Sequence, residues 1–317
     1  MNSRNQLHST CVPWAHLRFR RVWCLLCTLF FCCMPELPEV ETVRRDLADV
    51  LPGRTITGIQ VFDPKLTAFA RVAESLVGQD FVEPQRRGKF LLLPFAAETR
   101  LLVIHLRMTG QMIYRRGEHI FASGHPARID PQHLPDRHTR VQFTLDDGGE
   151  LFFNDQRRFG TVLLLTPAAV ETMLARFGIE PGHPGWTQQY FDGLVKNRTT
   201  SIKALLLNQN LIFGLGNIYA DEVCFRSGVL PMRPAGKLTK AERERIFQNC
   251  SAVLAEAIEC RGTSIRDFVD GSGRPGGFAE KLRVYQRQGQ ECLVCATPIS
   301  KVKAAGRGTH YCSRCQK

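Results

Sequence analysis

Two cysteine pairs near the C-terminus, Cys292-x2-Cys295 and Cys312-x2-Cys315, limit what this chain can fold into more than any other feature. Sixteen residues separate the two pairs. Pairs at such a separation suit four thiolate ligands around one tetrahedral zinc ion. Four protein ligands leave no open coordination position, so we expect one structural zinc and not a catalytic metal. Two disulfides are the alternative, which a reducing compartment disfavours.

The other cysteines are consistent with a reducing compartment. The chain of 317 residues has 12 cysteines, five of them before residue 34. Cys224, Cys250 and Cys260 are scattered through helix-like sequence, where we expect unpaired, buried thiols. We therefore expect a cytoplasmic protein with bound zinc and without a disulfide framework.

The chain is basic, with a formal net charge of +12. The first 33 residues contribute four arginines and no acid, so the remaining 38 basic and 30 acidic residues still carry +8. This excess suggests a polyanionic partner, although many basic proteins bind none. At this length the chain can form two domains, each with its own core.

Residues 1–33 resemble a segment that is not part of the folded body. Arginines at 18, 20 and 21 precede the apolar run 22–33, which is the outline of a signal peptide and too short to span a bilayer. We favour a second interpretation, in which these residues precede the true start at Met34 or are removed. A free N-terminus after Met34 would have a chemical use.

That use concerns Pro35, which directly follows Met34 and is followed by Glu36 and Glu39. If the initiator Met34 is removed, the secondary amine of Pro35 becomes the N-terminus. An α-amino group titrates near pH ~8, so part of it is uncharged at neutral pH. It can then attack a carbon at the aldehyde level and form an iminium, with Glu36 moving the proton. Taken alone, the stretch is better explained as the acidic start of a helix, and only the downstream motifs favour the catalytic interpretation.

The remaining pattern predicts several strands followed by helices. Strand-like segments lie at 55–62, 81–95, 101–106, 140–145, 151–153 and 161–165, and residues 146–149 predict a hairpin turn. Strands without helices between them indicate a sandwich or flattened barrel. Residues 115–138 are predicted to form a polar surface loop. Helices are predicted after Pro38, over 167–177 and 200–209, and from the capping box Thr239–Glu242 to Gly262.

Three motifs together resemble formamidopyrimidine-DNA glycosylase, a bifunctional family that removes oxidised purines from DNA. They are PELPEVET at 35–42, GLGNIYA at 214–220 and the four cysteines, and the resemblance runs from Met34 to Lys317. It implies an α+β multidomain fold: a catalytic β-sandwich with a flanking helix (34–165), a linker (166–187), a helical helix-two-turn-helix domain (188–285) and a four-cysteine zinc-finger hairpin (286–317).

The resemblance also assigns site residues. It makes Pro35 the nucleophile and Glu36 the proton donor, with Glu39 orienting the site, and it adds Lys89 and Arg307 as residues that reach the site or the DNA phosphates. Met108 would fill the space of an extruded base, while Arg157 and Phe159 would contact the widowed base and the stack. The DNA contacts expected on this basis are His105, Met108, Arg157, Phe159, Asn217 and Arg307.

The implied activity is excision of 8-oxoguanine and formamidopyrimidines through a Schiff base, followed by β,δ-elimination. Zinc would be the only cofactor, damaged double-stranded DNA the partner, and a monomer sufficient. A lid over the base is expected near 270–277. One alternative is an endonuclease VIII-like enzyme for oxidised pyrimidines, which Leu37 and the Arg157/Phe159 pair disfavour. The other is a zinc-ribbon DNA-binding protein without catalytic activity.

Overall fold

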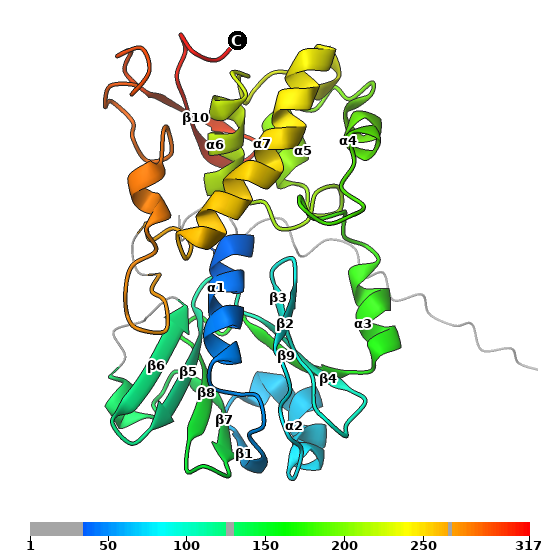
Figure 1. Ribbon diagram of the computed structural model, residues 1–317, viewed down its shortest axis with the longest axis vertical. Helices are drawn as coiled ribbons and strands as arrows, with labels where there is room; N and C mark the ends of the chain where they lie inside the picture. Colours follow the sequence, from blue (N-terminus) through cyan, green and yellow to red (C-terminus); the bar gives the residue numbers. More distant parts are fainter. Residues whose placement is uncertain (1–33, 125–129, 266–267) are drawn as a thin grey trace, which may run out of the picture. The chain divides into compact units, whose positions relative to one another are not determined.

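The computed structural model describes residues 34–124, 130–265 and 268–317. Both interpretations of residues 1–33 therefore lie outside the described residues. The described part combines a β-sandwich, a helical region and a C-terminal two-stranded hairpin, as the α+β expectation required (Figure 1).

The β-sandwich consists of two antiparallel sheets. The five-stranded sheet has the order β1-β7-β8-β5-β6 and the four-stranded sheet the order β2-β3-β4-β9. The bounds are β1 (Ile56–Val61), β2 (Gln85–Arg87), β3 (Phe90–Leu93), β4 (Leu101–His105), β5 (Gly110–Arg116), β6 (His119–Gly124), β7 (Thr139–Leu145), β8 (Glu150–Asp155) and β9 (Thr161–Leu165). The predicted turn at 146–149 joins β7 to β8.

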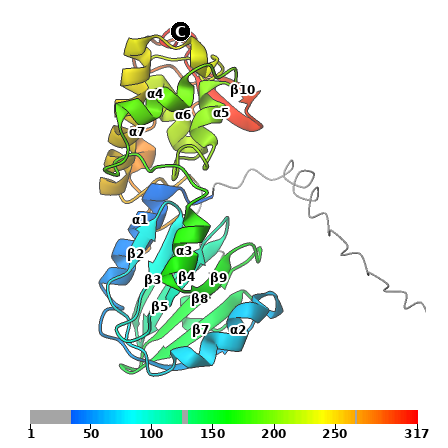
Figure 2. The ribbon, with the colours of Figure 1, turned by 90° about the vertical axis from the view of Figure 1, so that its right-hand side faces the viewer.

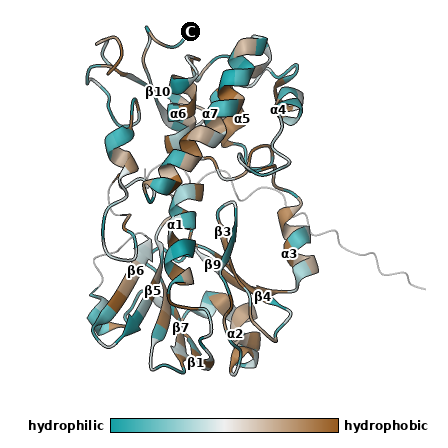
Figure 3. Cartoon of the chain, viewed as in Figure 1, coloured by the Kyte–Doolittle hydropathy of each residue, from teal (hydrophilic) through white to brown (hydrophobic). Residues whose placement is uncertain are grey.

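Side chains from both sheets fill the space between them. Alternate residues of β3 show the principle: Leu91 and Leu93 belong to the inner core, while Phe90 and Leu92 pack on the outer side against α3 (Pro167–Leu174). A strand covered on both faces is apolar throughout. Hydrophobic residues accordingly dominate β4 in Figure 3. They also dominate α2 (Thr67–Ala73), which packs against β9 and β1.

Two expectations for this region were wrong. The stretch 81–95 is not one strand, because β2 and β3 fold back on each other at Gly88, whose φ of 57° favours glycine. The stretch 115–138 is not only a loop, because it completes β5 and contains β6, which pair over their whole length. The strand β6 was not predicted because polar residues at both of its ends leave only a short apolar stretch between them.

The helical region is built from α4 (Gln188–Val195), α5 (Ile202–Leu207), α6 (Asn217–Arg226) and α7 (Lys240–Glu259). The predicted capping box forms at the start of α7, where the Thr239 hydroxyl accepts from the Glu242 N–H and Glu242 accepts from the Thr239 N–H. The hairpin consists of β10 (Ser300–Ala304) and β11 (Arg307–Tyr311). None of the helices in the described ranges is long and apolar enough to cross a bilayer.

Helix α1 (Leu37–Ala48) belongs to both halves. Val40, Val43 and Leu47 lie in the sandwich core, whereas Leu37 lies in the core of the helical region. Figures 1 and 2 show α1 between the sandwich strands and α7. The first turn of α1 is therefore held where the two halves meet.

Candidate active site

Glu36 lies at the start of α1 and is held by the start of α6. Its Oε1 accepts a hydrogen bond of 3.0 Å from the Ile218 N–H. The fit requires glycine at 216, since a Cβ there would lie 2.3 Å from the Glu36 Cδ. The N-terminus of α6, whose partial positive charge favours an anion, thus holds a carboxylate of the chain itself.

Burial raises the pKa of Glu36 to about 7, and the nearby Lys89 cation opposes the rise. A carboxyl group with this pKa can be protonated or ionised near neutral pH, which suits proton transfer. Its Oε2 is buried and has no hydrogen-bond partner among the described residues. This oxygen is therefore available to a reacting group.

Lys89 approaches the same place from the β2–β3 turn. Its side chain is buried and its Nζ donates to the Leu215 carbonyl at 3.0 Å. The Gly88 turn sets this direction, because the Phe213 ring packs so closely that a Cβ at residue 88 would lie 2.1 Å from it. Lys89 and Glu36 thus approach the same place, as expected, and the close packing around each of them leaves no room for a Cβ at residues 88 and 216.

Glu39 ties three segments together. Its Oε2 accepts from the Glu36 N–H at 2.8 Å, and its Oε1 accepts from the Thr263 N–H at 2.8 Å and from the Tyr219 hydroxyl. Burial raises the pKa of Glu39, and these hydrogen bonds oppose the rise. Both oxygens are occupied, so the contacts support an orienting role. Sequence reasoning assigned no role to Tyr219, although it lies in the GLGNIYA motif, or to Thr263, which lies in no motif.

Pro35 is buried beside Glu36, and its nitrogen carries the peptide bond from Met34 in the full chain. The next backbone N–H groups are already used: Glu36 donates to Glu39, and Leu37 donates to the Gly214 carbonyl at 3.2 Å. The geometry therefore fixes the position of Pro35 directly next to the titratable carboxyl group.

His105 ends β4 and packs edge-on against Phe90, with 4.7 Å between the ring centroids. Its Nδ1 accepts from the Arg107 N–H at 3.0 Å. Burial lowers the pKa of His105 to about 3, and Arg107 and Lys89 add to the shift. The imidazole is therefore neutral at physiological pH. Met108 follows in the same turn and is half-buried.

Arg157 and Phe159 lie together in the turn after β8. The Arg157 guanidinium carbon lies 4.9 Å from the centroid of the Phe159 ring, and half of the Phe159 side chain is exposed. The segment is a turn with Arg158 at φ 58°, and the two side chains contact each other within it.

Asn217 contacts the zinc hairpin next to Arg307. The Asn217 Nδ2 donates to the Gly308 carbonyl at 3.1 Å, and Gly308 follows Arg307 at the start of β11. Arg307 is exposed, and its guanidinium has no hydrogen bond or ion pair within the described part of the chain. A free guanidinium on a hairpin tip suits a phosphate contact. No described contact joins Arg307 to Glu36.

A buried ion pair, which the sequence did not reveal, fixes the hairpin on the helices. Lys203 Nζ lies 2.6 Å from an Asp221 oxygen, and both side chains are fully buried. Lys203 also donates to the Gly308 carbonyl at 3.0 Å, and Asp221 accepts from the His310 N–H at 2.9 Å. These bonds hold β11 against α5 and α6.

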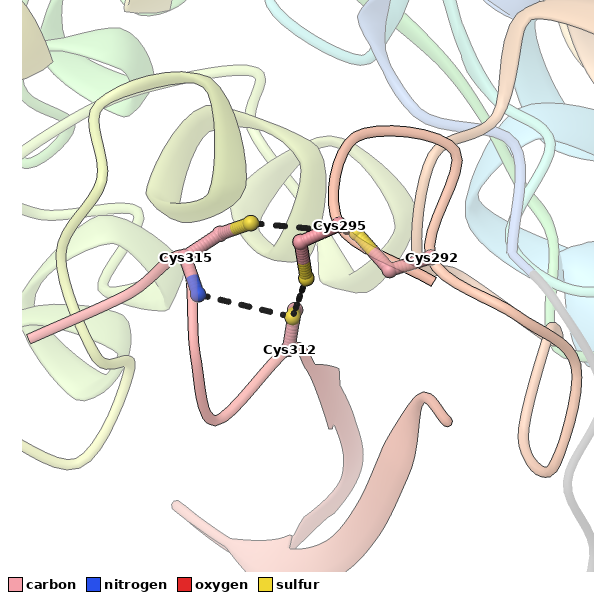
Figure 4. A group of neighbouring side chains, drawn as sticks. All are labelled: Cys292, Cys295, Cys312 and Cys315. Atoms are coloured by element: carbon pink, nitrogen blue, oxygen red, sulfur yellow. Dashed lines mark hydrogen bonds between the residues drawn. The ribbon is translucent and has the colours of Figure 1, made fainter. Parts of the chain in front are cut away.

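The four C-terminal cysteines converge as expected (Figure 4). The Sγ distances are 3.8 Å between Cys292 and Cys315 and 3.4 Å between Cys295 and Cys312. A tetrahedral zinc with bonds of about 2.3 Å requires sulfur atoms about 3.8 Å apart, whereas a disulfide requires about 2.0 Å. The residues fit one zinc ion and do not fit the disulfide alternative.

The segment expected to be a mobile lid is anchored in its described part. The Gly271 N–H donates to the buried Asp46 at 2.8 Å, and Val269 pairs with Gly124 at the end of β6. Arg261 bridges Asp46 and Asp270. Residues 268–277 are thus attached both to α1 and to the sandwich.

Three protein-family models match the chain: "Formamidopyrimidine-DNA glycosylase N-terminal domain" at 34–162, "Formamidopyrimidine-DNA glycosylase H2TH domain" at 177–269, and "Zinc finger found in FPG and IleRS" at 289–317. Among curated relatives, formamidopyrimidine-DNA glycosylase of Symbiobacterium thermophilum is 45% identical over 288 residues, covering 89% of each chain. That of Pelotomaculum thermopropionicum is 41% identical, covering 90% of this chain and 99% of its own.

Solved structures of Fpg and MutM are also similar to this chain. A complex of Lactococcus lactis Fpg with DNA that contains an abasic site aligns with a TM-score of 0.78 at 31% identity, covering 89% of this chain and 99% of that one. MutM bound to DNA with carbocyclic 8-oxo-G aligns with a TM-score of 0.77, also at 31% identity, covering 89% of this chain and 100% of that one.

Proposed function

The chain belongs to the formamidopyrimidine-DNA glycosylase family, and on that basis we propose that it removes oxidised purines from DNA and then cleaves the strand at the vacated site. The observation that carries the proposal is the buried Glu36 carboxyl group, with a pKa raised to about 7 by burial, directly after Pro35. A nucleophile needs such a neighbour to move protons at neutral pH.

The reaction begins when the damaged nucleotide leaves the base stack, because its sugar is inaccessible inside the duplex. The lone pair of the free Pro35 nitrogen attacks C1′, and the base departs with the electrons of the glycosidic bond and takes up the proton that the nitrogen loses. Glu36 protonates the sugar ring oxygen, and the ring opens to give an iminium between Pro35 and C1′. Elimination of the 3′-phosphate and then the 5′-phosphate leaves a one-nucleotide gap.

Other residues hold the DNA in this proposal. Lys89 contacts a phosphate near Glu36, and the neutral His105 contacts the backbone. Met108 enters the space of the extruded base, while Arg157 hydrogen-bonds the widowed base and Phe159 enters the stack. Asn217 and Arg307 bind phosphates on the other side. Zinc on Cys292, Cys295, Cys312 and Cys315 maintains the hairpin that carries Arg307.

We propose further that the protein acts as a monomer on double-stranded DNA in the bacterial cytoplasm, at the nucleoid. The domain limits 34–165, 166–187, 188–285 and 286–317 remain part of this proposal. The purine assignment rests on the names of the relatives and on the Arg157/Phe159 pair.

The proposal is tested with matched duplexes that contain either 8-oxoguanine or thymine glycol, each with and without borohydride. We expect release of 8-oxoguanine and a covalent, borohydride-trapped complex. Faster release of thymine glycol would favour the endonuclease VIII-like alternative. Tight binding with neither release nor trapping would favour a DNA-binding protein without catalysis.

A further inference from the structure

We propose that Asp155 is a positioning residue that locks the Met108 turn and the Arg157–Phe159 turn into one unit. The proposal rests on the proposed function, because that function assigns both turns to the DNA. The two turns come from separate segments of the chain and would have to enter a duplex together. Asp155 lies between them, and no motif marked it as functional.

Asp155 is the last residue of β8 and its side chain is buried, with 1% of the residue exposed. Its Oδ1 accepts from the Thr109 hydroxyl and, at 3.1 Å, from the Arg157 N–H. Its Oδ2 accepts from the Gly160 N–H at 2.6 Å. One carboxylate therefore binds the first turn through Thr109 and both ends of the second turn through Arg157 and Gly160.

Thr109 completes the connection from the other side. Its hydroxyl oxygen accepts from the Arg157 N–H at 3.0 Å while its hydrogen points to Asp155. Thr109 directly follows Met108, and the Arg157 guanidinium packs on Phe159. Met108, Arg157 and Phe159 are thus each part of this hydrogen-bonded group or directly next to a residue in it.

Both turns have backbones that need such support. Arg107 and Arg158 have φ values of 54° and 58°, in the left-handed region that is unfavourable for a non-glycine residue. A Cβ at Gly160 would lie 2.5 Å from the Phe153 ring and 3.0 Å from the Asp155 Oδ2. The second turn therefore fits one position on the carboxylate, and the hydrogen bonds offset the backbone cost.

The expected consequence is selective. Excising a base from a duplex requires extrusion, filling of the space and wedging of the stack at the same time. Cleaving a preformed abasic site in single-stranded DNA requires none of these, yet it uses the same nucleophile and the same acid. Loss of the hydrogen bonds between Asp155, Thr109 and Arg157 should therefore slow excision from the duplex and leave cleavage of the single-stranded abasic site unchanged.

Thr109→Val and Thr109→Ser form the matched pair for the test. Valine keeps the shape and removes the hydroxyl, whereas serine keeps the hydroxyl. We expect Thr109→Val to lower kcat/KM for 8-oxoguanine excision from a duplex about 10- to 100-fold, the range found for small misplacements of reacting groups. Cleavage of the single-stranded abasic site should change less than about twofold, and Thr109→Ser should restore excision.

Asp155→Asn tests the acceptor that both turns share, because the amide N–H group of asparagine would face a backbone N–H group. The double variant Asp155→Asn/Thr109→Val should lose less excision activity than the product of the two single fold-losses. Both substitutions disrupt the same hydrogen-bonded connection. Equal loss of both activities, no loss of either, or failure of Thr109→Ser to restore excision would overturn the proposal. A wild-type enzyme that excises no base would instead overturn the proposed function itself, and this inference with it.

Discussion

Glu36 is the residue whose ionisation connects the structure to the chemistry. Burial raises its pKa to about 7, so the carboxyl group is protonated below that pH and becomes a carboxylate above it. Protonation of the sugar ring oxygen needs the acid form, and attack needs an uncharged Pro35 amine with a pKa near ~8. The two requirements oppose each other, so the rate should pass through a maximum between these values.

Replacing Glu36 with glutamine keeps the oxygen that accepts from Ile218 and removes the acid. We expect excision to fall about 10²- to 10⁴-fold, the usual contribution of a general acid or base. The decline of the rate on the alkaline side of this maximum should disappear, leaving only the rise from amine deprotonation. A pH–rate profile of single-turnover excision measures both effects. An unchanged alkaline limb would show that another group is the acid.

A second prediction at this scale concerns the pair Lys203 and Asp221. Removing one partner of a buried pair leaves an uncompensated charge, which costs about 3–5 kcal/mol. Lys203→Met should therefore lower the free energy of unfolding by this amount in a urea titration. The double variant with Asp221→Asn should be less destabilised than Lys203→Met alone. A double variant destabilised by the sum of the two single effects would mean that the pair is not coupled.

Among the elements, the β10–β11 hairpin depends most on a bound ion. Its buried cluster is small and includes Cys292 and Cys312, and a segment of this size needs metal or disulfides to fold. Chelation of zinc should disorder the hairpin and weaken DNA binding, while the amide signals of the sandwich remain. Adding zinc back should restore binding. Full binding by zinc-free protein would contradict a structural role.

Arg307, at the start of β11, should contribute as one phosphate contact. Arg307→Ala is expected to weaken binding similarly for all sequences and to reduce the slope of log K against log salt by about 1. Arg71 on α2 is the control, since it is also exposed and lies on another element. An equal change for Arg71→Ala would indicate a general effect of charge and not a contact.

The elements also show what the sequence can and cannot predict. Spacing alone identified the zinc ligands, and residue chemistry suggested Glu36 as the acid, because both signals are local. The contacts of Glu39 with Tyr219 and Thr263 span about 180 and 224 residues, and no local pattern encodes such distances. The strand β6 was missed because its polar ends and the adjoining proline-containing segment resemble a loop.

For the whole molecule, α1 joins the sandwich core to the helical core and places Pro35 where the two meet. The proposed nucleophile is the free amine of Pro35, and the family models begin at residue 34. The proposed reaction therefore requires an active protein that begins at Pro35. The same amine would result from cleavage of the chain before Pro35, or from a translation start at Met34 followed by removal of this methionine.

Peptide mass spectrometry of the borohydride-trapped complex from natively expressed protein tests this requirement most directly. Reduction converts the iminium to a stable amine, so the nucleotide remnant marks the nucleophile. We predict one modified peptide that begins at Pro35, with the remnant on its N-terminal nitrogen. A modified Lys89, or a trapped protein in which residue 35 is still joined to Met34, would contradict the account.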